Sequence, residues 1–410
     1  MYTTNCMVCK AQSLHRFLSL GSTPLANAFL KKEDINLSEP SYPLEVLFCN
    51  TCSLVQLNYT VSSELMFKNY VYVSSTSDAL REHFRGLAEE AVKLFIKSKD
   101  DLIIDIGSND GTLLKEFKKF NVRVLGVEPA TNIAKIANSE GIETINKFFN
   151  ESVATKILEE KGNTRIITAT NVFAHVADLD GFVKGVYKLL DDYGVFIVET
   201  PYLVDLIQNT EFDTIYHEHL RYYSIQPLKI LFERHNMKIF DVKRVPVHGG
   251  TIRVFIKRDT NHEFEEKSSV KEFIYLEKGL KLYSVERYLE FAKNVENIKR
   301  DLLDLLKLLK SEGKHIVGYG AAAKGNTLLN YCKIDTNLLD YIVDKNPHKQ
   351  SLFAPGTHIP VFPPEKLLED KPDYMLILAW NFADEIIKQQ KGFKDAGGKF
   401  IIPIPKPKIV

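Results

Sequence analysis

Apolar positions in the central part of the chain alternate between short runs and longer stretches with helical spacing. The helical spacing begins near Asp78, a suitable capping residue, and includes Leu80, Phe84, Leu87, Ala91 and Leu94. Further on, apolar runs predict strands at 102–106, 122–127, 165–168 and 194–199, with helices at 112–117, 131–138 and 183–190. This alternation predicts an α/β fold with a doubly wound, mostly parallel sheet. Two more runs, 238–245 and 251–257, are expected to close the sheet as an antiparallel pair.

The regions on either side of this pattern differ from it. Residues 1–70 contain short mixed segments and no long helical pattern. A charged helical stretch at 285–309 leads into a second alternating region, with strands expected at 315–318, 339–343 and 374–378. We therefore predict three domains, at 1–70, 71–284 and 285–410, and interpret the charged helix as a connector between domains.

Composition and charge narrow the class of protein. The 410 residues include 53 basic and 53 acidic side chains, so the formal net charge is zero, which argues against a nucleic-acid or membrane-surface partner. The first ten residues contain no apolar signal-like region, and no apolar run is long enough to cross a bilayer. We expect a cytoplasmic protein whose oligomeric state is open and is compatible with a monomer.

Four of the five cysteines form two CxxC pairs, Cys6 with Cys9 and Cys49 with Cys52. In a reducing compartment such pairs are more often metal ligands than disulfides. Four thiolates complete a tetrahedral site with no open position, so we expect a structural zinc ion. A redox role is the alternative, but neither pair has a thioredoxin-like pattern around it.

The strand predicted at 102–106 ends in a glycine-containing turn that opens a helix. Gly107 permits the sharp turn, and Gly111 is expected to let the helix pack close to a ligand. Glu128 ends the next strand, where a carboxylate suits the ribose hydroxyls of either NAD or S-adenosylmethionine. The polar residues between the glycines decide between the two, because Asp110 would repel a pyrophosphate but suits an ammonium-bearing sulfonium cofactor. The loop therefore favours S-adenosylmethionine.

Seven motifs, in order and spacing, resemble the sugar C-methyltransferase family of deoxysugar biosynthesis over nearly the whole chain. They are the paired CxxC region, YVYVSSTS at 70–77, DIGSNDGT at 105–112, NVFAH at 171–175, YHEH at 216–219, HGGTIR at 248–253 and GYGAAAKG at 318–325. The resemblance implies an N-terminal zinc-binding domain, a central class I (Rossmann-like) methyltransferase domain and a C-terminal Rossmann-like domain for the nucleotide of the substrate. That substrate would be a dTDP- or GDP-linked 4-keto-6-deoxysugar, methylated at C3. The cofactor-binding residues would be Asp105, Gly107, Ser108, Asn109, Gly111, Glu128 and Asn171.

The resemblance also implies catalytic residues, and the chemistry assigns them roles. Methylation beside a ketone requires a base for a weakly acidic C–H proton and a group that stabilises the enolate. Because the pKa of histidine lies near working pH, we take His219 as the base in preference to Glu218 and His175. Glu218 would orient His219 or bind substrate, Tyr216 would donate a hydrogen bond to the oxygen, and His175 would contact the enolate oxygen or hydroxyls. Tyr70 matches a family tyrosine, with Tyr72 as its near twin and a possible substrate contact.

The C-terminal glycine motif is open to two interpretations. It follows a predicted strand and opens a helix, so by itself it also resembles a dinucleotide fingerprint with Ala323 at the third glycine. Lys324 suits a phosphate as a point charge. Further substrate contacts are expected from Asp344, His248 and Arg253, the last with a surface salt bridge as its alternative. Phe148 and Phe149 are interpreted as core aromatics in preference to an adenine-binding wall.

Two other functions remain as alternatives to the methyltransferase. One is an NAD-dependent oxidoreductase acting on a nucleotide sugar through either glycine loop. The other is a non-catalytic, zinc-containing scaffold with a degenerate methyltransferase fold. The polar YHEH segment argues against the scaffold, since four titratable or polar residues in succession are a poor core segment.

Overall fold

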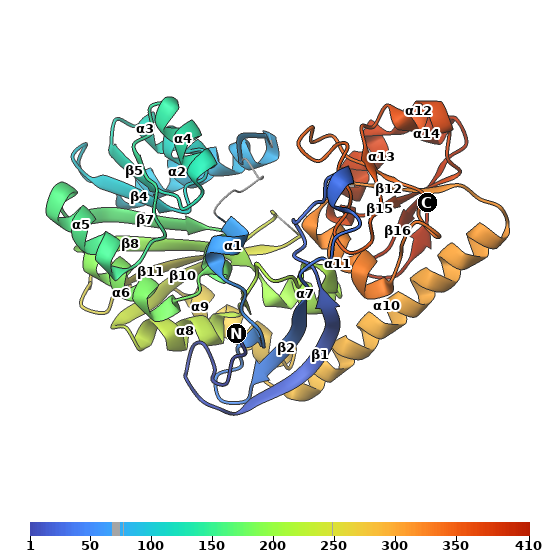
Figure 1. The fold of residues 1–410 in the computed structure, drawn as a ribbon. Helices are drawn as coiled ribbons and strands as arrows, with labels where there is room; N and C mark the ends of the chain where they lie inside the picture. Colours follow the sequence, from blue (N-terminus) through green and yellow to red (C-terminus); the bar gives the residue numbers. More distant parts are fainter. Residues whose placement is uncertain (68–73, 77, 248) are drawn as a thin grey trace.

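The computed structural model describes residues 1–67, 74–76, 78–247 and 249–410, and it contains three sheets (Figure 1). Tyr70, Tyr72 and His248 lie outside the described residues. Two lobes, built on the central and the C-terminal sheets, stand side by side above a small N-terminal sheet (Figure 1). Within the described ranges, no helix has both the length and the apolar character needed to span a bilayer.

The N-terminal sheet is completed by a strand from the central region. Its order is β1 (Leu14–Thr23), β2 (Tyr42–Cys49), β3 (Val55–Leu57) and β9 (Arg221–Tyr222), with antiparallel pairing throughout. β9 follows the YHEH segment at 216–219 after a single residue, Leu220. The cysteine-bearing region and the YHEH segment are therefore fixed to each other by one hydrogen-bonded sheet.

The central sheet has seven strands, and its parallel core matches the sequence prediction. Its order is β10 (Met237–Val245), β11 (Thr251–Arg258), β8 (Leu190–Pro201), β7 (Thr164–Thr170), β4 (Leu102–Ile106), β5 (Arg123–Val127) and β6 (Thr144–Ile145). Strands from β8 to β6 are parallel, while β11 is antiparallel to both β8 and β10. The predicted closing pair is thus confirmed.

Helices cover both faces of the central sheet, as a parallel sheet requires. Ile103 of β4 packs with helices α2 (Asp78–Phe95), α3 (Thr112–Lys118) and α4 (Thr131–Ser139). Ile104 of the same strand packs with the other face, where α5 (Glu151–Lys161), α6 (Leu179–Leu189) and α8 (Ile225–Glu233) lie. The other helical elements before residue 285 are α1 (Ser63–Phe67), η1 (Lys32–Asp34), η2 (Ser74–Thr76), η3 (Phe173–His175), α7 (Leu203–Gln208), η4 (Phe212–Thr214) and α9 (Ser268–Gly279).

The C-terminal sheet is smaller and also mostly parallel. Its order is β14 (Val361–Phe362), β13 (Ile342–Val343), β12 (Ile316–Tyr319), β15 (Tyr374–Ile377), β16 (Lys399–Ile402) and β17 (Lys408–Ile409), with β17 alone antiparallel to its neighbour. The helical elements are α11 (Ala323–Cys332), α12 (Lys366–Asp370), η5 (Trp380–Phe382), α13 (Ala383–Gln389) and α14 (Lys391–Asp395). This is the Rossmann-like arrangement expected of the C-terminal region.

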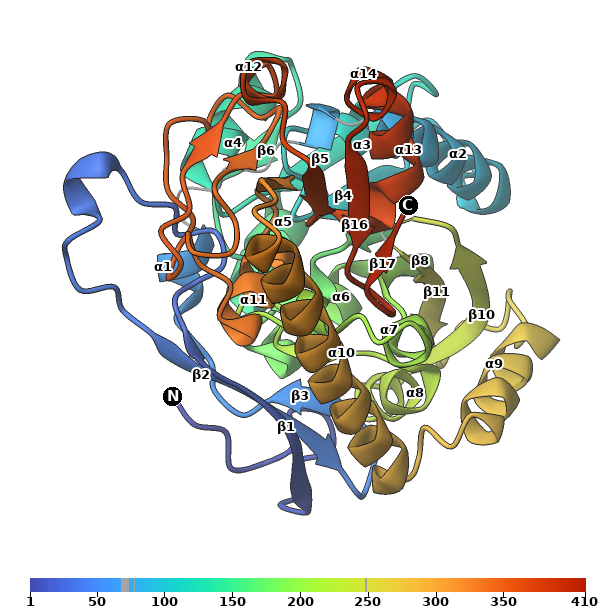
Figure 2. The ribbon, with the colours of Figure 1, turned by 90° about the vertical axis from the view of Figure 1, so that its right-hand side faces the viewer.

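The long helix α10 (Val285–Ser311) connects the central and C-terminal regions, and it also packs on the N-terminal sheet. Figure 2 shows it crossing the molecule beside β1. The Tyr288 ring lies 5.1 Å from Phe17 of β1 and 4.7 Å from Phe48 of β2, measured between centroids. One continuous cluster of buried apolar side chains extends from the cysteine region through the central sheet into the C-terminal region. This shared core holds the two lobes around the cavity described next.

Candidate active site

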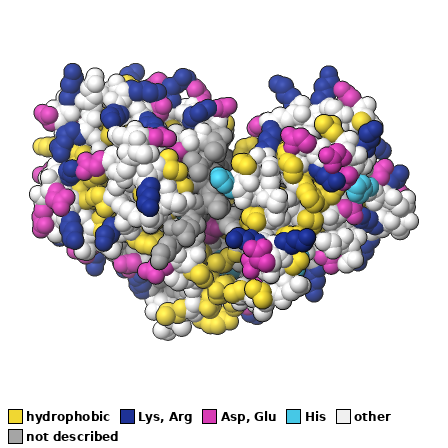
Figure 3. All heavy atoms as spheres, turned by 45° about the horizontal axis from the view of Figure 1, so that its top comes forward, with side chains coloured by type: hydrophobic (Ala, Val, Ile, Leu, Met, Phe, Trp, Pro, Cys, Tyr) yellow, Lys and Arg dark blue, Asp and Glu magenta, His cyan; other side chains and the backbone are white. Residues whose placement is uncertain are grey.

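A cavity of about 760 Å³ lies between the carboxyl edge of the central sheet and the C-terminal domain. In the space-filling view a notch separates the two lobes (Figure 3). The wall on the central domain includes the loop at 105–109 (the cofactor loop), the 171–178 segment, and Tyr216 and His219 of the YHEH segment. The opposite wall consists of 322–324, 379 and 381–382. This is the edge at which ligands bind in open α/β sheets.

The loop after β4 is built by backbone conformation and by Glu128. Gly107 has φ +70°, and a Cβ placed on it would lie 2.3 Å from a methyl carbon of Val172, so glycine is required there. Asn109 also has a positive φ, which asparagine tolerates better than most residues. Its N–H donates to Glu128 Oε2 at 2.9 Å, and the Ala130 N–H donates to Oε1 at 2.8 Å. Glu128 therefore shapes the loop while its carboxylate lines the cavity.

Several polar atoms in the cavity wall fit a polar cofactor. Asp105 accepts a hydrogen bond from Thr168 Oγ1 at 2.6 Å, and burial, reinforced by the charges of Glu128 and Glu199, raises the pKa of Asp105 to about 7. Across the described ranges, Ser108 Oγ and Asn171 Oδ1 are buried without a hydrogen-bond partner. Unpartnered buried polar atoms beside a cavity indicate a ligand that supplies the missing hydrogen bonds. The hydroxyl, amino and carboxylate groups of S-adenosylmethionine meet that requirement.

Two expectations for the loop need correction. Gly111 does not line the cavity; it has φ +77°, and a Cβ there would lie 3.1 Å from the Ile142 side chain, so this glycine serves packing. Asp110 is also turned away from the cavity wall. Its carboxylate accepts hydrogen bonds from the Ser75 N–H at 3.2 Å and from Thr112 Oγ1 at 2.6 Å. It therefore fixes the start of α3 and is not placed to meet an ammonium group.

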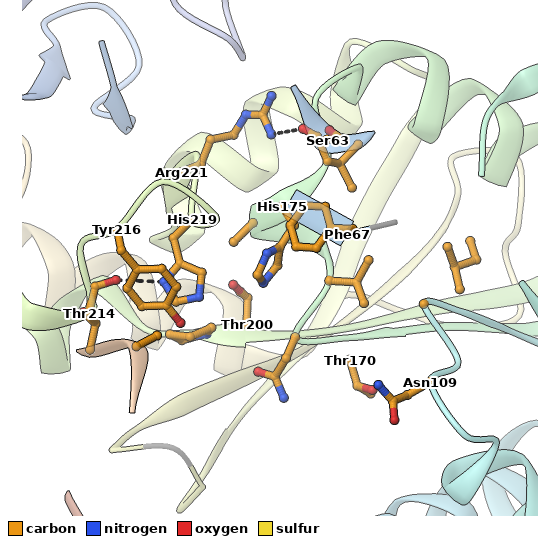
Figure 4. Close-up of a pocket in the computed structure, with 18 of the residues that line it drawn as sticks. Ser63, Phe67, Asn109, Thr170, His175, Thr200, Thr214, Tyr216, His219 and Arg221 are labelled. Carbon is orange, nitrogen blue, oxygen red and sulfur yellow. Dashed lines mark hydrogen bonds between the residues drawn. The ribbon is translucent and has the colours of Figure 1, made fainter. Parts of the chain in front are cut away.

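Two histidines that are 44 positions apart in sequence meet in the cavity. The ring centroids of His175 and His219 lie 5.0 Å apart in an edge-to-face arrangement (Figure 4). His219 Nδ1 lies 2.8 Å from the Thr214 carbonyl oxygen, which only accepts, so Nδ1 carries the proton and Nε2 is the basic nitrogen. Burial, reinforced by His219, lowers the pKa of His175 to about 3. His175 is therefore neutral at neutral pH.

The four residues of the YHEH segment point in different directions. Tyr216 and His219 line the cavity, with ring centroids 4.2 Å apart. His217 is buried elsewhere and lies 3.2 Å from the Tyr42 carbonyl oxygen. Glu218 is also outside the cavity wall, and its Oε1 accepts a hydrogen bond from the Asn27 side chain at 2.7 Å. The expectation that Glu218 orients His219 is not met by this geometry, because the Thr214 carbonyl occupies that place.

The wall formed by the C-terminal domain brings Lys324 to the cavity. Its Nζ lies 3.1 Å from Asn381 Oδ1 and 4.3 Å from the centroid of the Trp380 ring. Glu211 lines the cavity as well, and burial raises its pKa to about 7 while the charge of Lys324 opposes that rise. Asn381 and Glu211 were missed by sequence reasoning, as was Arg221, whose guanidinium donates to the Val176 carbonyl in Figure 4. None of the three lies in a motif that marks it out.

Two residues predicted to contact substrate, Arg253 and Asp344, instead contact other groups of the protein. Arg253 is buried between two carboxylates, with Nε 2.6 Å from Glu199 Oε1 and a guanidinium nitrogen 2.6 Å from Glu90 Oε2. It is neither a cavity residue nor a surface salt-bridge partner. Asp344 accepts the N–H of Asn346 in its own loop at 2.7 Å and that of Ala321 in the loop after β12 at 2.6 Å, so it joins these two loops, and it is absent from the cavity wall.

The two phenylalanines interpreted as core residues both reach the cavity. Phe148 is 39% exposed and lines the wall, so it is not a core residue. Phe149 also lines the wall and packs against Phe182 with a centroid distance of 5.1 Å. The adenine-wall alternative therefore fits Phe148, whereas Phe149 both lines the cavity and packs against the core, as interpreted.

The four cysteines of the CxxC pairs meet in one place. Their sulfur atoms all lie within 4.8 Å of one another, with Cys6 to Cys52 at 3.4 Å and Cys9 to Cys49 at 3.6 Å. A tetrahedral zinc ion with Zn–S bonds of about 2.3 Å separates neighbouring sulfurs by about 3.8 Å. Four thiolates at this spacing fit a structural zinc ion, as predicted.

Fold and site together define a class I methyltransferase, and comparison with known proteins agrees. Three family models match in order: "Putative zinc binding domain" at 6–67, "Methyltransferase domain" at 80–242 and "C-methyltransferase C-terminal domain" at 246–405. The C-methyltransferase NovU of Streptomyces niveus is 37% identical over 405 residues, which cover 99% of this chain and 96% of NovU. The chain therefore belongs to the C-methyltransferase family, and it is an S-adenosylmethionine-dependent enzyme with a zinc-binding region.

More distant matches are confined to part of the chain. The ubiquinone biosynthesis O-methyltransferase of Azorhizobium caulinodans is 26% identical over 133 residues, or 32% of this chain and 51% of that enzyme. The solved structure of magnesium protoporphyrin IX methyltransferase (ChlM) from Synechocystis PCC 6803 with bound SAH covers 43% of this chain and 83% of its own, with 11% identity and a TM-score of 0.35. The family assignment depends on neither of them. The oxidoreductase and scaffold alternatives are not supported by these comparisons.

Proposed function

We propose that this C-methyltransferase transfers the methyl group to C3 of a nucleotide-diphosphate-linked 4-keto-6-deoxysugar, through an enolate generated by His219. The observation that carries the proposal is the pair of His175 and His219, 5.0 Å apart in the cavity that the cofactor loop also lines. Methylation of carbon depends more strongly on a base than methylation of a hydroxyl group does, because the C–H proton is less acidic than the hydroxyl proton. A dTDP or GDP carrier suits the proposal equally.

In the proposed mechanism, Nε2 of His219 takes the proton from C3, and the C3–H electron pair moves into the C3–C4 enolate. The Thr214 carbonyl, 2.8 Å from Nδ1, keeps the proton of the neutral ring on Nδ1, so that Nε2 is the basic nitrogen. The same carbonyl stabilises the imidazolium that forms. When bound, S-adenosylmethionine supplies an electrophilic methyl group for C3. Residues that would hold it are Asp105, Gly107, Ser108, Asn109, Glu128 and Asn171, all in the cavity wall.

His175 and Tyr216 are the proposed partners of the enolate oxygen. His175 stays neutral because burial lowers its pKa to about 3, and its buried Nδ1 has no hydrogen-bond partner within the described part of the chain. A neutral imidazole donates a hydrogen bond without transferring its proton, which suits an oxyanion. Tyr216, packed on His219, has a hydroxyl that can do the same.

The opposite wall supports a nucleotide-diphosphate carrier for the sugar. Lys324 presents an ammonium group at the cavity, near the start of α11, where a phosphate finds both a positive charge and a helix N-terminus. Asn381 and Phe382 add a hydrogen-bonding group and an aromatic surface to the same wall. We place the reaction in the cytoplasm, with a small-molecule substrate and no nucleic-acid or membrane partner, which the balanced charge of the chain supports.

The test is hydrogen exchange at C3 in the absence of methyl transfer. The protein is incubated in D₂O with S-adenosylhomocysteine and dTDP- or GDP-4-keto-6-deoxyglucose, and NMR follows the C3 proton. Wild type should exchange it, and His219→Gln should not. His262→Gln, at an exposed position, is the matched control. Exchange that persists in His219→Gln would show that another group is the base.

A further inference from the structure

The short helix η4 lies between the proposed base and the C-terminal domain. Its last residue, Thr214, provides the carbonyl that accepts the Nδ1–H of His219 at 2.8 Å. Asp213 is the residue before it, and its side chain is fully buried. The position of the carbonyl therefore depends on what holds Asp213.

Asp213 is held by the C-terminal domain. The indole N–H of Trp380 donates to Asp213 Oδ2 at 2.7 Å, across 167 positions of sequence. On the other side of Asp213, the Phe212 ring packs against Tyr331 of α11 with a centroid distance of 5.3 Å. Two contacts from the C-terminal domain thus fix η4, one polar and one aromatic.

Trp380 is flanked by residues of the cavity wall. Its neighbours Ala379 and Asn381 line the cavity, and its ring lies 4.3 Å from the ammonium of Lys324. Burial raises the pKa of Asp213, while the charge of Lys324 and the Trp380 N–H oppose that rise. The C-terminal wall of the cavity and the buried carboxylate are thereby electrostatically linked.

We propose that Asp213 is a positioning residue, which holds η4 on Trp380 so that the Thr214 carbonyl keeps His219 in its Nδ1–H form. The inference rests on the proposed function, since it takes His219 as the base. Asp213 does not touch the substrate; it acts through the backbone of the next residue. Loss of the contact lets the carbonyl move, and His219 then spends part of its time with the proton on Nε2, where it cannot act as a base.

Two substitutions separate this role from simple domain attachment. Trp380→Phe removes the N–H donor and keeps an aromatic ring beside Lys324, and Asp213→Asn keeps an oxygen that can accept from Trp380. We expect Trp380→Phe to lower kcat by about tenfold or more, because small misplacements of a catalytic group have large effects. The KM for S-adenosylmethionine should not change, and Asp213→Asn should stay close to wild type. Tyr319→Phe, which removes a hydrogen bond to Gln390 within the C-terminal domain, is the control and should keep wild-type kcat.

The direct signature is the tautomer of His219. Long-range ¹H–¹⁵N NMR of protein labelled at its 11 histidines resolves the ring nitrogens, and His219→Gln identifies the signals that belong to this residue. Wild type should show His219 protonated at Nδ1, and Trp380→Phe should show a mixture of tautomers. The proposal is wrong if Trp380→Phe keeps wild-type kcat, or if kcat falls while the Nδ1–H signature is unchanged. If His219→Gln still exchanges the C3 proton, the proposed function fails first, whatever Trp380→Phe does.

Discussion

Replacement of Arg253 by methionine should destabilise the protein strongly although it lies outside the cavity. The guanidinium is buried and joins β11 to Glu199 of β8 and to Glu90 of α2, with two contacts of 2.6 Å. Burial alone would raise the pKa of Glu199, but His83 and Arg253 outweigh it, so the pKa is lowered and the carboxylate stays charged. The substitution therefore leaves a buried charge with fewer partners.

The magnitude follows from the partners that remain. Removal of one partner from a buried ion pair costs about 3–5 kcal/mol. Glu199 keeps His83 at 2.8 Å and Glu90 keeps Lys243, so we expect the lower end, about 3 kcal/mol, or roughly a 100-fold change in the folding equilibrium. Arg16→Met is the control, because its ion pair with Glu45 is exposed and should contribute at most about 1 kcal/mol.

The assay is urea-induced unfolding of the zinc-loaded protein, followed by circular dichroism, for wild type, Arg253→Met and Arg16→Met. Addition of Glu199→Gln to Arg253→Met should restore part of the loss, because it removes the charge left without its partner. If Arg253→Met is no less stable than Arg16→Met, the buried ion-pair account is refuted.

Three further predictions concern the loop, the metal and pH. Gly107→Ala should abolish S-adenosylhomocysteine binding in calorimetry, because its Cβ would clash with Val172, whereas Gly86→Ala, in open space, should not. Cys49→Ser should lose the bound zinc measured by mass spectrometry and lower the unfolding temperature. The pKa of His175 falls from about 6.5 when unfolded to about 3 in the fold, so stability should be lost as pH falls from 6.5 towards 3. His175→Asn should flatten that acid limb in pH-dependent melting, and an unchanged limb would contradict the assignment.

The parts of the fold that could be predicted are those with local causes. Buried parallel strands such as β4 are largely apolar, with Asp105 as the one polar residue of β4, and the turn at Gly107 is marked by its own residue type. The cavity pairing of His175 with His219 was anticipated through two motifs, each at a position where the family resemblance implied a catalytic group. Their meeting confirms that the motifs converge, while their roles stay predictions.

The parts that could not be predicted depend on partners distant in sequence. Glu218 turns to Asn27, 191 positions away, and Arg253 turns to α2, so a strand pattern could not tell a buried ion pair from a substrate contact. Asp344 was predicted to contact substrate, but its carboxylate accepts hydrogen bonds from backbone N–H groups, at Ala321 and Asn346. Backbone donors of this kind are not visible in the pattern of residue types. The link between Trp380 and Asp213 joins two domains and leaves no sequence signal.

The most direct test of the central claim is the destination of the methyl group. Purified protein is mixed with S-adenosylmethionine carrying a ¹³C-labelled methyl and with dTDP- and GDP-linked 4-keto-6-deoxyglucose, and the products are read by mass spectrometry and ¹³C NMR. We predict a labelled methyl bonded to C3 with wild type and His262→Gln, and no labelled sugar with His219→Gln. A label on oxygen, on another carbon, or on C3 in the His219→Gln reaction would contradict the account.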